Sequence, residues 1–141
     1  MSIKAHKAKI YGIDWSQERT NEIVTCSLDK TIKLWDIQVV PESGQPLQPK
    51  LTINTSYPVW RARDLPFAQG ILSLPQRGDT ALEMWSYHDE HVPVHVFEGH
   101  TDVVKEFVWR RGGKGLCTLF PAYSMSESTS RHERFSAHHL V

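Results

Sequence analysis

The distribution of apolar and polar residues along the chain predicts short β-strands separated by turns. Residues 9–15 (KIYGIDW) alternate around a glycine, and residues 22–27 (EIVTCS) form a compact β-branched run. Residues 31–35 (TIKLW) alternate strictly, with Ile32 and Leu34 on one face. A period of two is typical of strands, and no sustained 3.6-residue period is present, so the sequence predicts no helix.

A loop and a further strand follow these three strands. Residues 39–50 (VVPESGQPLQPK) are rich in Pro, Gly and Ser, which predicts a loop. Residues 51–53 (LTI) are apolar and β-branched again, and they predict a fourth strand.

The same pattern recurs along the chain. Residues 5–15 (AHKAKIYGIDW) align with residues 99–109 (GHTDVVKEFVW), and a degenerate copy lies between them. The matched residues are His6 with His100, Trp15 with Trp109, and Trp35 with Trp85. This spacing predicts a repeat unit in the high forties, close to the roughly 40–45 residues of a four-stranded propeller blade.

Composition narrows the function classes. The 16 basic and 16 acidic residues cancel, so no net field attracts the chain to nucleic acid or to an acidic membrane. No apolar run approaches the roughly 18 residues that a membrane helix needs, so membrane association would go through a partner. The two cysteines, Cys26 and Cys117, are far apart and are interpreted as reduced thiols in the cytoplasm.

The order of motifs resembles the WD-repeat β-propeller family. An Ala-His or Gly-His pair is followed by three strands, by SLDKTIKLWD and by an outer strand before the next Gly-His. The resemblance implies an all-β fold, a partial β-propeller with about two four-stranded blades and the start of a third. The implied blades are 5–54, 55–98 and an incomplete 99–113. Markers of the later repeats are Trp85, Gly99 and His100.

The resemblance also assigns a structural role to one polar set. It implies that His6, Ser27, Asp29 and Trp35 form a hydrogen-bonded chain inside the first blade. The same serine, histidine and aspartate also fit a hydrolytic triad, but the tryptophan and the repeated framework favour the structural interpretation. We therefore expect no catalytic residue, no cofactor and no metal.

Three histidines and a basic-aromatic segment have other interpretations. His88, His91 and His95 have the composition of a metal site, but a loop with Pro93 and without a nearby cysteine favours solvated side chains. Arg61 and Arg63 flank Trp60, as in some RNA-binding surfaces. Without net positive charge or a nucleic-acid motif, a solvated face or a protein contact is the favoured interpretation.

Longer segments are similar to the WD-repeat subunit of the SEA complex, the fungal counterpart of the animal GATOR complex. These segments are AHKAKIYGIDWS, EIVTCSLDKTIKLWD, YPVWRAR and GHTDVVKEFVWR. The similarity implies a non-catalytic scaffold that binds other subunits of a multi-protein complex in TOR nutrient signalling. It also implies a cytoplasmic location, with peripheral association at the vacuolar or lysosomal membrane through partners. The alternatives are a substrate-receptor propeller of a ubiquitin ligase and an RNA-binding propeller.

Loops that emerge on one propeller face are the first candidates for partner contact, because loops carry recognition. The candidates are Lys7, Lys30, Tyr57, Arg77, Asp79 and Thr101.

The chain departs from the family after residue 113. Residues 114–141 have neither a Ser-x-Asp nor a Trp, and they are expected to form a divergent, disordered tail of a gene-model fragment. Because so few blades cannot close a ring, we expect open outer faces and self-association. One face is expected to expose Ile10, Ile13, Ile32 and Leu34, and the other Val103, Val104 and Phe107.

Overall fold

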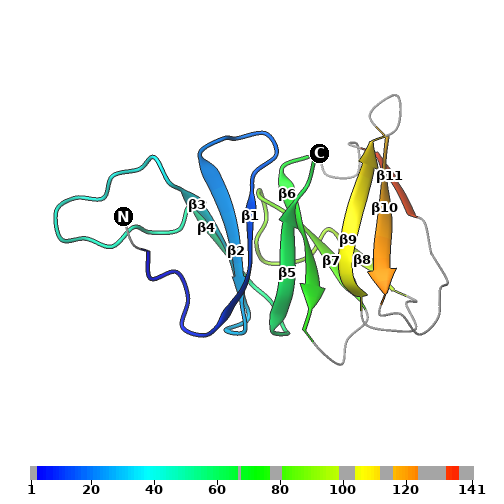
Figure 1. Ribbon diagram of the computed structural model, residues 1–141, viewed down its shortest axis with the longest axis horizontal. Coiled ribbons are helices and arrows are strands. Elements are labelled where there is room, and N and C mark those ends of the chain that lie inside the picture. Colours follow the sequence, from blue (N-terminus) through cyan, green and yellow to red (C-terminus); the bar gives the residue numbers. More distant parts are fainter. Residues whose placement is uncertain are drawn as a thin grey trace.

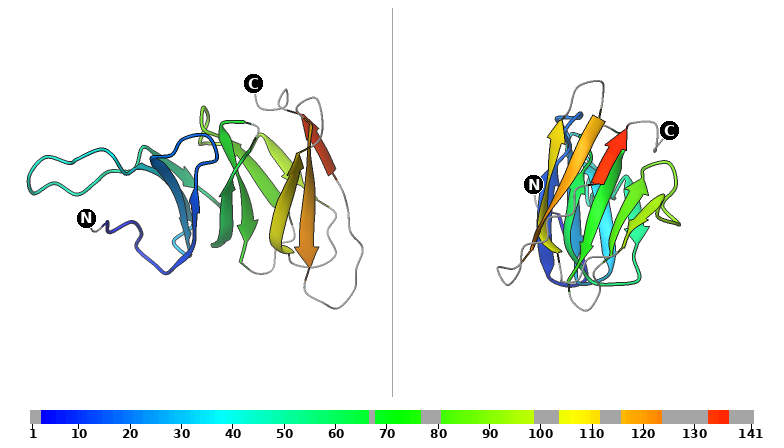
Figure 2. Two further views of the ribbon diagram at one scale, coloured as in Figure 1. Left: turned by 45° about the horizontal axis from the view of Figure 1, so that its top comes forward. Right: turned by 90° about the vertical axis from the view of Figure 1, so that its right-hand side faces the viewer.

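The computed structural model describes residues 3–66, 68–76, 81–98, 104–111, 116–123 and 133–136, and after Val104 it describes the backbone alone. All regular structure in these residues is β, in three antiparallel sheets, and none of them is helical. Figures 1 and 2 show the three sheets side by side in a row. The predicted all-β class, with two four-stranded units, is confirmed.

Each of the first two sheets is a meander in which every strand pairs with its neighbour in sequence. The first blade contains β1 (Ile10–Trp15), β2 (Glu22–Ser27), β3 (Thr31–Asp36) and β4 (Leu51–Asn54). The second blade contains β5 (Val59–Asp64), β6 (Gly70–Pro75), β7 (Leu82–Ser86) and β8 (His95–Phe97). Antiparallel neighbours of this kind can be joined by turns or loops and need no crossover connection; the longest connection here is the loop 37–50 between β3 and β4.

The Ser-x-Asp motif makes the turn between β2 and β3. The Asp29 carboxylate accepts a hydrogen bond from the Thr31 N–H at 3.0 Å, and the Asp29 N–H donates to Ser27 Oγ at 3.1 Å. Lys30, between them, has φ 64°, in the left-handed region. An aspartate that bonds the backbone two residues on stabilises such a turn.

A β-bulge interrupts the first strand of each blade, at the equivalent position. In β1 the pairing passes from Ile10 to Gly12, so Tyr11 is the extra residue. In β5 it passes from Val59 to Arg61, so Trp60 is the extra residue. A bulge bends its strand and redirects the extra side chain, and both blades therefore present an aromatic residue at the same point.

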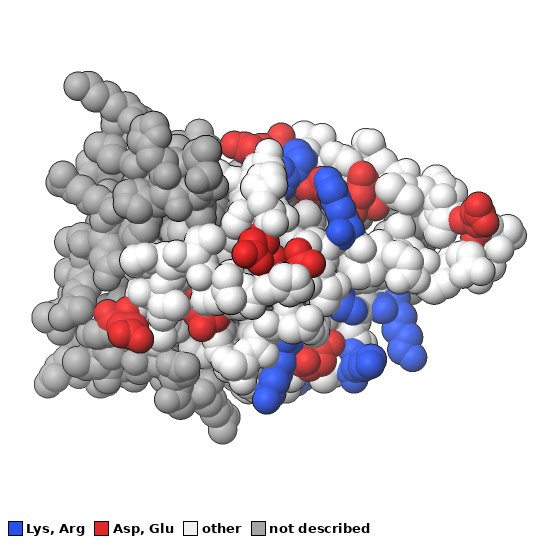
Figure 3. All heavy atoms as spheres, turned by 180° about the vertical axis from the view of Figure 1, so that it is seen from behind, with Lys and Arg blue, Asp and Glu red and all other residues white. Residues whose placement is uncertain are grey.

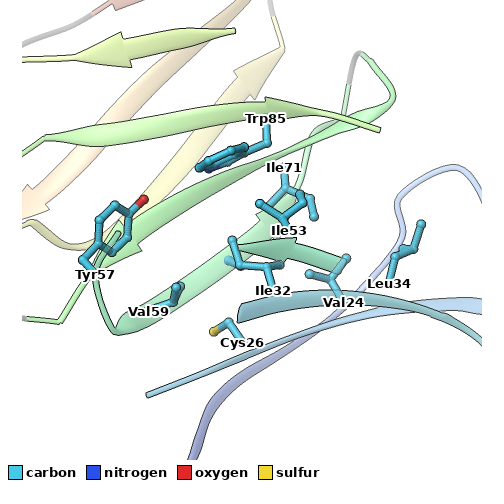
Figure 4. Close-up of a cluster of buried hydrophobic side chains, with 10 residues drawn as sticks. Val24, Cys26, Ile32, Leu34, Ile53, Tyr57, Val59, Ile71 and Trp85 are labelled. Carbon is cyan, nitrogen blue, oxygen red and sulfur yellow. The ribbon is translucent and has the colours of Figure 1, made fainter. Parts of the chain in front are cut away.

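The main core lies between the two blades. Figure 4 shows Val24, Cys26, Ile32 and Leu34 of the first blade facing Ile71 and Trp85 of the second. Ile32 and Ile71 are fully buried, and full burial of one such side chain is worth about 1.5–3 kcal/mol. Each blade therefore stabilises its neighbour through the face it covers.

The opposite face of the second blade contacts the third sheet. That sheet contains β9 (Val104–Arg111), β10 (Leu116–Tyr123) and β11 (Glu133–Ser136), in the order β11-β10-β9. A second core cluster joins the second blade to Val104, which is 2% exposed; its other members are Leu65, Leu72, Leu74, Leu82, Met84 and Phe97. The prediction that Val104 lies on an open face is therefore wrong, while Val103 and the side chain of Phe107 lie outside the described residues.

Two strands lie where the sequence predicted a disordered tail. Cys117–Tyr123 of β10 pair with β9, and Glu133–Ser136 of β11 pair with β10. The apolar and aromatic content of Leu116–Tyr123 suits a strand, and the edge of β9 is available for it to pair with. The predicted disorder of 114–141 is therefore wrong for these two ranges, and the remainder of that segment lies outside the described residues.

The predicted open face of the first blade is wrong in part. Ile32 and Leu34 are 0% and 3% exposed because they face the second blade, whereas Ile13 is 61% exposed. Ile13 pairs with Thr25 and so lies on the other face of the sheet from Ile32, which pairs with Cys26. The exposed apolar side chains of β1 are Ile10, Ile13 and Trp15.

Candidate functional site

A chain of hydrogen bonds runs through the first blade from Asp29 to Trp35. His6 Nδ1 lies 3.0 Å from an Asp29 carboxylate oxygen, and His6 Nε2 lies 2.7 Å from Thr25 Oγ1. The indole N–H of Trp35 donates to the same Thr25 hydroxyl at 2.9 Å. With the imidazole proton on Nδ1, His6 donates to Asp29, Thr25 donates to His6, and Trp35 donates to Thr25, so every polar atom of the chain has a partner.

Thr25 therefore takes the place that the sequence analysis gave to Ser27. Ser27 is fully buried, but its hydroxyl accepts a hydrogen bond from the Asp29 N–H and no described contact joins it to His6. The physical reason is the position along β2: Thr25 and Ser27 lie on the same face of the sheet as Trp35, but Trp35 pairs with Ile23, two residues from Thr25 and four from Ser27. The other three members of the predicted set, His6, Asp29 and Trp35, lie within the chain.

Burial sets the charge state of this chain. Burial lowers the pKa of His6 from its ordinary 6.5, against the opposing effect of the Asp29 carboxylate. Although burial alone would raise the pKa of Asp29, hydrogen bonds from Thr31 and the Lys7 N–H and the nearby His6 hold it below its usual value. At neutral pH the hydrogen-bonded chain therefore contains the neutral imidazole of His6 and the ionised carboxylate of Asp29.

The geometry does not suit a nucleophile. The Thr25 hydroxyl accepts a hydrogen bond from the indole, and this residue is 4% exposed. Trp35, at 2% exposed, packs with Ala5 and Leu47 over the same region. A hydroxyl that attacks a substrate needs an open path to it and a nearby oxyanion site, and this hydroxyl has a packed indole beside it.

The second blade builds a corresponding chain from different residues. The indole N–H of Trp85 donates to Ser73 Oγ at 3.0 Å, and Ser73 Oγ lies 2.7 Å from the Tyr57 hydroxyl. The Tyr57 hydroxyl also donates to a Glu83 carboxylate oxygen at 2.9 Å. Tyr57 thus stands in for the histidine of the first blade, and Glu83 for its carboxylate. Sequence reasoning identified Trp85 but missed this pairing, since Tyr57 is separated from Ser73 and Glu83 along the chain.

A polar cluster also ties the two blades together. The Asp64 carboxylate accepts hydrogen bonds from Ser16 Oγ at 3.1 Å, from the Gln17 N–H at 2.8 Å and from the Tyr87 hydroxyl. Asp14 in turn accepts from the Asp64 N–H at 3.1 Å. Because Asp64 is only 4% exposed, these donors satisfy a buried carboxylate that would otherwise destabilise the interface.

The predicted partner-contact residues fall into three groups. Lys7 and Lys30 are exposed at the end of the first blade where β1 begins. Tyr57 is 7% exposed because its ring belongs to the core between the blades, so its assignment as a surface contact is wrong. The remaining candidates, Arg77, Asp79 and Thr101, and the repeat markers Gly99 and His100 lie outside the described residues.

The described residues contain no group of three His, Cys, Asp or Glu side chains placed to hold a metal ion. His88 is exposed, and the ring of His95 meets the ring of Phe97 edge-on, 4.6 Å between centroids. None of the residues that the structure describes forms a helix long and apolar enough to cross a membrane.

Two pockets lie at the end of the blades opposite His6. One, with a volume of about 550 Å³, is an open pocket formed by Asp36 and the loop that follows it, and its lining includes Val39, Pro46 and Leu47. The other, about 220 Å³, lies where the blades meet and includes Arg19, Lys50 and Tyr87. Neither pocket includes a residue of the two hydrogen-bonded chains.

Two four-stranded blades with matching bulges and matching indole–hydroxyl chains define a WD-repeat propeller unit. The family model described as "WD domain, G-beta repeat" matches residues 1–36. The chain belongs to the WD-repeat family, as the motif order predicted.

Proteins similar to the chain extend the resemblance across both blades. It is 37% identical over 116 residues, 80% of the chain, to "GATOR2 complex protein WDR59" of Homo sapiens. It is 39% identical over 112 residues, 77% of the chain, to an "RWD, RING finger and WD repeat-containing protein" of Schizosaccharomyces pombe. It is 32% identical over 120 residues, again 77% of the chain, to "Maintenance of telomere capping protein 5" of Saccharomyces cerevisiae. These matches span 11%, 8% and 10% of the respective relatives.

Proposed function

We propose that the chain is part of a non-catalytic propeller scaffold in a multi-protein complex of the GATOR2 or SEA type, acting in TOR nutrient signalling. The observation that carries the proposal is the 37% identity to a GATOR2 complex protein across 80% of the chain. The buried hydroxyls of Thr25 and Ser73 support the non-catalytic role, because each accepts a hydrogen bond from a buried indole. The partners are other protein subunits, and contact with the vacuolar or lysosomal membrane goes through them.

Exposed lysines at the end of the first blade are the proposed first contacts. Lys7 and Lys30 lie on loops next to the buried chain that contains His6 and Asp29. A loop fixed by a packed blade presents its side chains with little loss of entropy on binding. We therefore assign the initial contact of a partner subunit to this end.

Affinity purification of a tagged chain from its own cells, followed by mass spectrometry, tests the proposal. The expected result is co-purification of other propeller-containing subunits of a GATOR2-like or SEA-like complex. The double variant Lys7→Gln/Lys30→Gln should recover less of them, and Thr20→Glu/Gln38→Glu, exposed at the opposite end, changes the net charge equally and serves as the control.

One relative favours a second candidate. The name of the S. pombe protein includes a RING finger, which makes a substrate receptor of a ubiquitin ligase the runner-up. Recovery of ligase adaptors or ubiquitin-conjugating enzymes in place of complex subunits would replace the scaffold proposal with this one.

A further inference from the structure

The extra residues of the two bulges, in β1 and β5, meet across the boundary between the blades. The rings of Tyr11 and Trp60 lie 4.8 Å apart between centroids, tilted by 38°. The Arg61 guanidinium lies 4.8 Å from the centroid of the Trp60 ring, and the Lys9 ammonium lies 5.7 Å from that of Tyr11. We call Lys9, Tyr11, Trp60 and Arg61 the aromatic–cation cluster.

Within the cluster, Arg61 is held in place by hydrogen bonds to the backbone. Arg61 Nη1 donates to the carbonyl oxygen of Tyr11 at 2.6 Å and to that of Trp60 at 3.1 Å. A Cβ at Gly12, next to Tyr11, would lie 2.8 Å from Cys26 Sγ, so this glycine leaves room for the buried Cys26 side chain beside β1. Side chains fixed in this way lose little further entropy when a partner binds.

The core does not account for these aromatic residues. Neither Tyr11 nor Trp60 belongs to a buried hydrophobic cluster, and both rings are partly exposed. Each blade thus has a large aromatic ring on its bulge, and the two rings pack together while both stay partly exposed. Trp, Tyr and Arg are the residues enriched at the energetic centres of protein interfaces.

Charge indicates the kind of partner. The chain has no net charge, yet in the first blade Lys4, Lys7, Lys9 and Lys30 lie at the end where β1 begins. Figure 3 shows Lys and Arg side chains gathered at the lower right, which is this end. The acidic residue of this end, Asp29, is already bonded to His6 and Thr31. The exposed acidic residues of the first blade, Glu18 and Glu42, belong to loops at the opposite end.

We propose that the aromatic–cation cluster is a docking site for an acidic segment of a partner protein. Carboxylates of the segment pair with Lys9 and Arg61, and an apolar side chain between them packs on Tyr11 and Trp60. The inference rests on the proposed scaffold function and names the chemistry of one contact. A nucleic-acid strand is disfavoured because the 16 basic and 16 acidic residues cancel, so the chain has no net positive charge to attract a phosphate backbone.

Fluorescence anisotropy with three labelled probes tests the site on the purified chain. The probes are an eight-residue peptide of alternating Glu and Phe, its Lys–Phe counterpart, and a twelve-nucleotide uridine RNA. The variants are Lys9→Gln, whose side chain makes no described hydrogen bond, and Arg61→Gln. Lys4→Gln is the matched control, because it removes one exposed charge at the same end but outside the cluster.

The account predicts that the Glu–Phe peptide binds and the other two probes bind at least about tenfold more weakly. Lys9→Gln and Arg61→Gln should each weaken peptide binding about five- to tenfold, as expected for charges beside an interface centre, while Lys4→Gln changes it less than about twofold. Equal weakening by Lys4→Gln and Lys9→Gln would overturn the site in favour of diffuse attraction. Tighter binding of the RNA would overturn it in favour of a nucleic-acid surface. The Lys9→Gln and Arg61→Gln variants could also co-purify complex subunits at unchanged yield. That result would refute the docking site and leave the scaffold proposal intact.

Discussion

The hydroxyl of Thr25 is the central link of the first blade, and replacing it with a methyl group isolates its contribution. Thr25→Val preserves shape but removes the partner of two buried groups, His6 Nε2 at 2.7 Å and Trp35 Nε1 at 2.9 Å. Each buried polar group left unsatisfied costs about 1–3 kcal/mol, and the two lie in one network, so we expect a total of about 2–4 kcal/mol.

Urea denaturation followed by circular dichroism measures this loss. Two variants calibrate it: Ser27→Ala, which removes one acceptor for the Asp29 N–H, and Thr20→Val, an exposed residue. Ser27→Ala should lower the free energy of unfolding by about 1 kcal/mol, and Thr20→Val by less than about 0.5 kcal/mol.

The test is the order of the three losses in free energy of unfolding. A loss for Thr25→Val no greater than that for Ser27→Ala would mean that the Thr25 hydroxyl does not link His6 to Trp35. The hydrogen-bonded chain through the first blade would then be wrong.

Three further predictions concern protonation, the boundary between the blades and the buried thiol. Folding lowers the pKa of His6 from 6.5, so the unfolded chain takes up the proton first as the pH falls. The stability of the folded chain is therefore full above about pH 6.5 and decreases below it. His6→Gln should flatten the change in urea midpoint between about pH 7.5 and 5.5. Tyr87→Phe removes a donor from the buried Asp64 carboxylate and should lower the free energy of unfolding by about 1–2 kcal/mol in the same assay; no change would indicate that the remaining donors suffice. Burial raises the pKa of Cys26 to about 12, so iodoacetamide should label its tryptic peptide only after unfolding, as read by mass spectrometry, and rapid labelling of the folded chain at neutral pH would contradict the packing between the blades.

Strand positions could be predicted where the signal is local. The predicted strand 22–27 coincides with β2, because a β-branched run between turn residues marks both of its ends. The Ser-x-Asp turn was similarly visible, since Asp29 bonds the backbone of Thr31 two residues later. Such features depend on residues that are close in sequence.

Membership of the polar chain could not be predicted in full, because it depends on the register between strands. Thr25 and Ser27 are both hydroxyl residues of one strand, and the family pattern alone favoured Ser27. The two lie on one face of β2, and only the pairing of β2 with β3 shows that Thr25 is the nearer to Trp35, which pairs with Ile23. Another register would place a different residue of β2 beside the indole.

The contacts of the second hydrogen-bonded chain, and those between the two blades, were hidden for a different reason. Tyr57 replaces a histidine in the second chain, and its contacts with Ser73 and Glu83 cross three segments of sequence. The contact between the tilted rings of Tyr11 and Trp60 depends on a bulge in each of two strands. A bulge changes the direction of a side chain without a mark in the alternation of apolar and polar residues.

The central claim is that each blade is closed by a hydrogen bond from its tryptophan to a buried hydroxyl. Amide and indole hydrogen exchange, followed by ¹⁵N–¹H NMR, tests it directly, because Trp35 and Trp85 are 2% and 3% exposed whereas Trp15 is 54% exposed. The indole N–H groups of Trp35 and Trp85 should exchange slowly. Thr25→Val should remove the protection of Trp35 alone, and Ser73→Ala that of Trp85 alone. Exchange of both indoles as fast as that of Trp15, or loss of both on either substitution, would contradict the account.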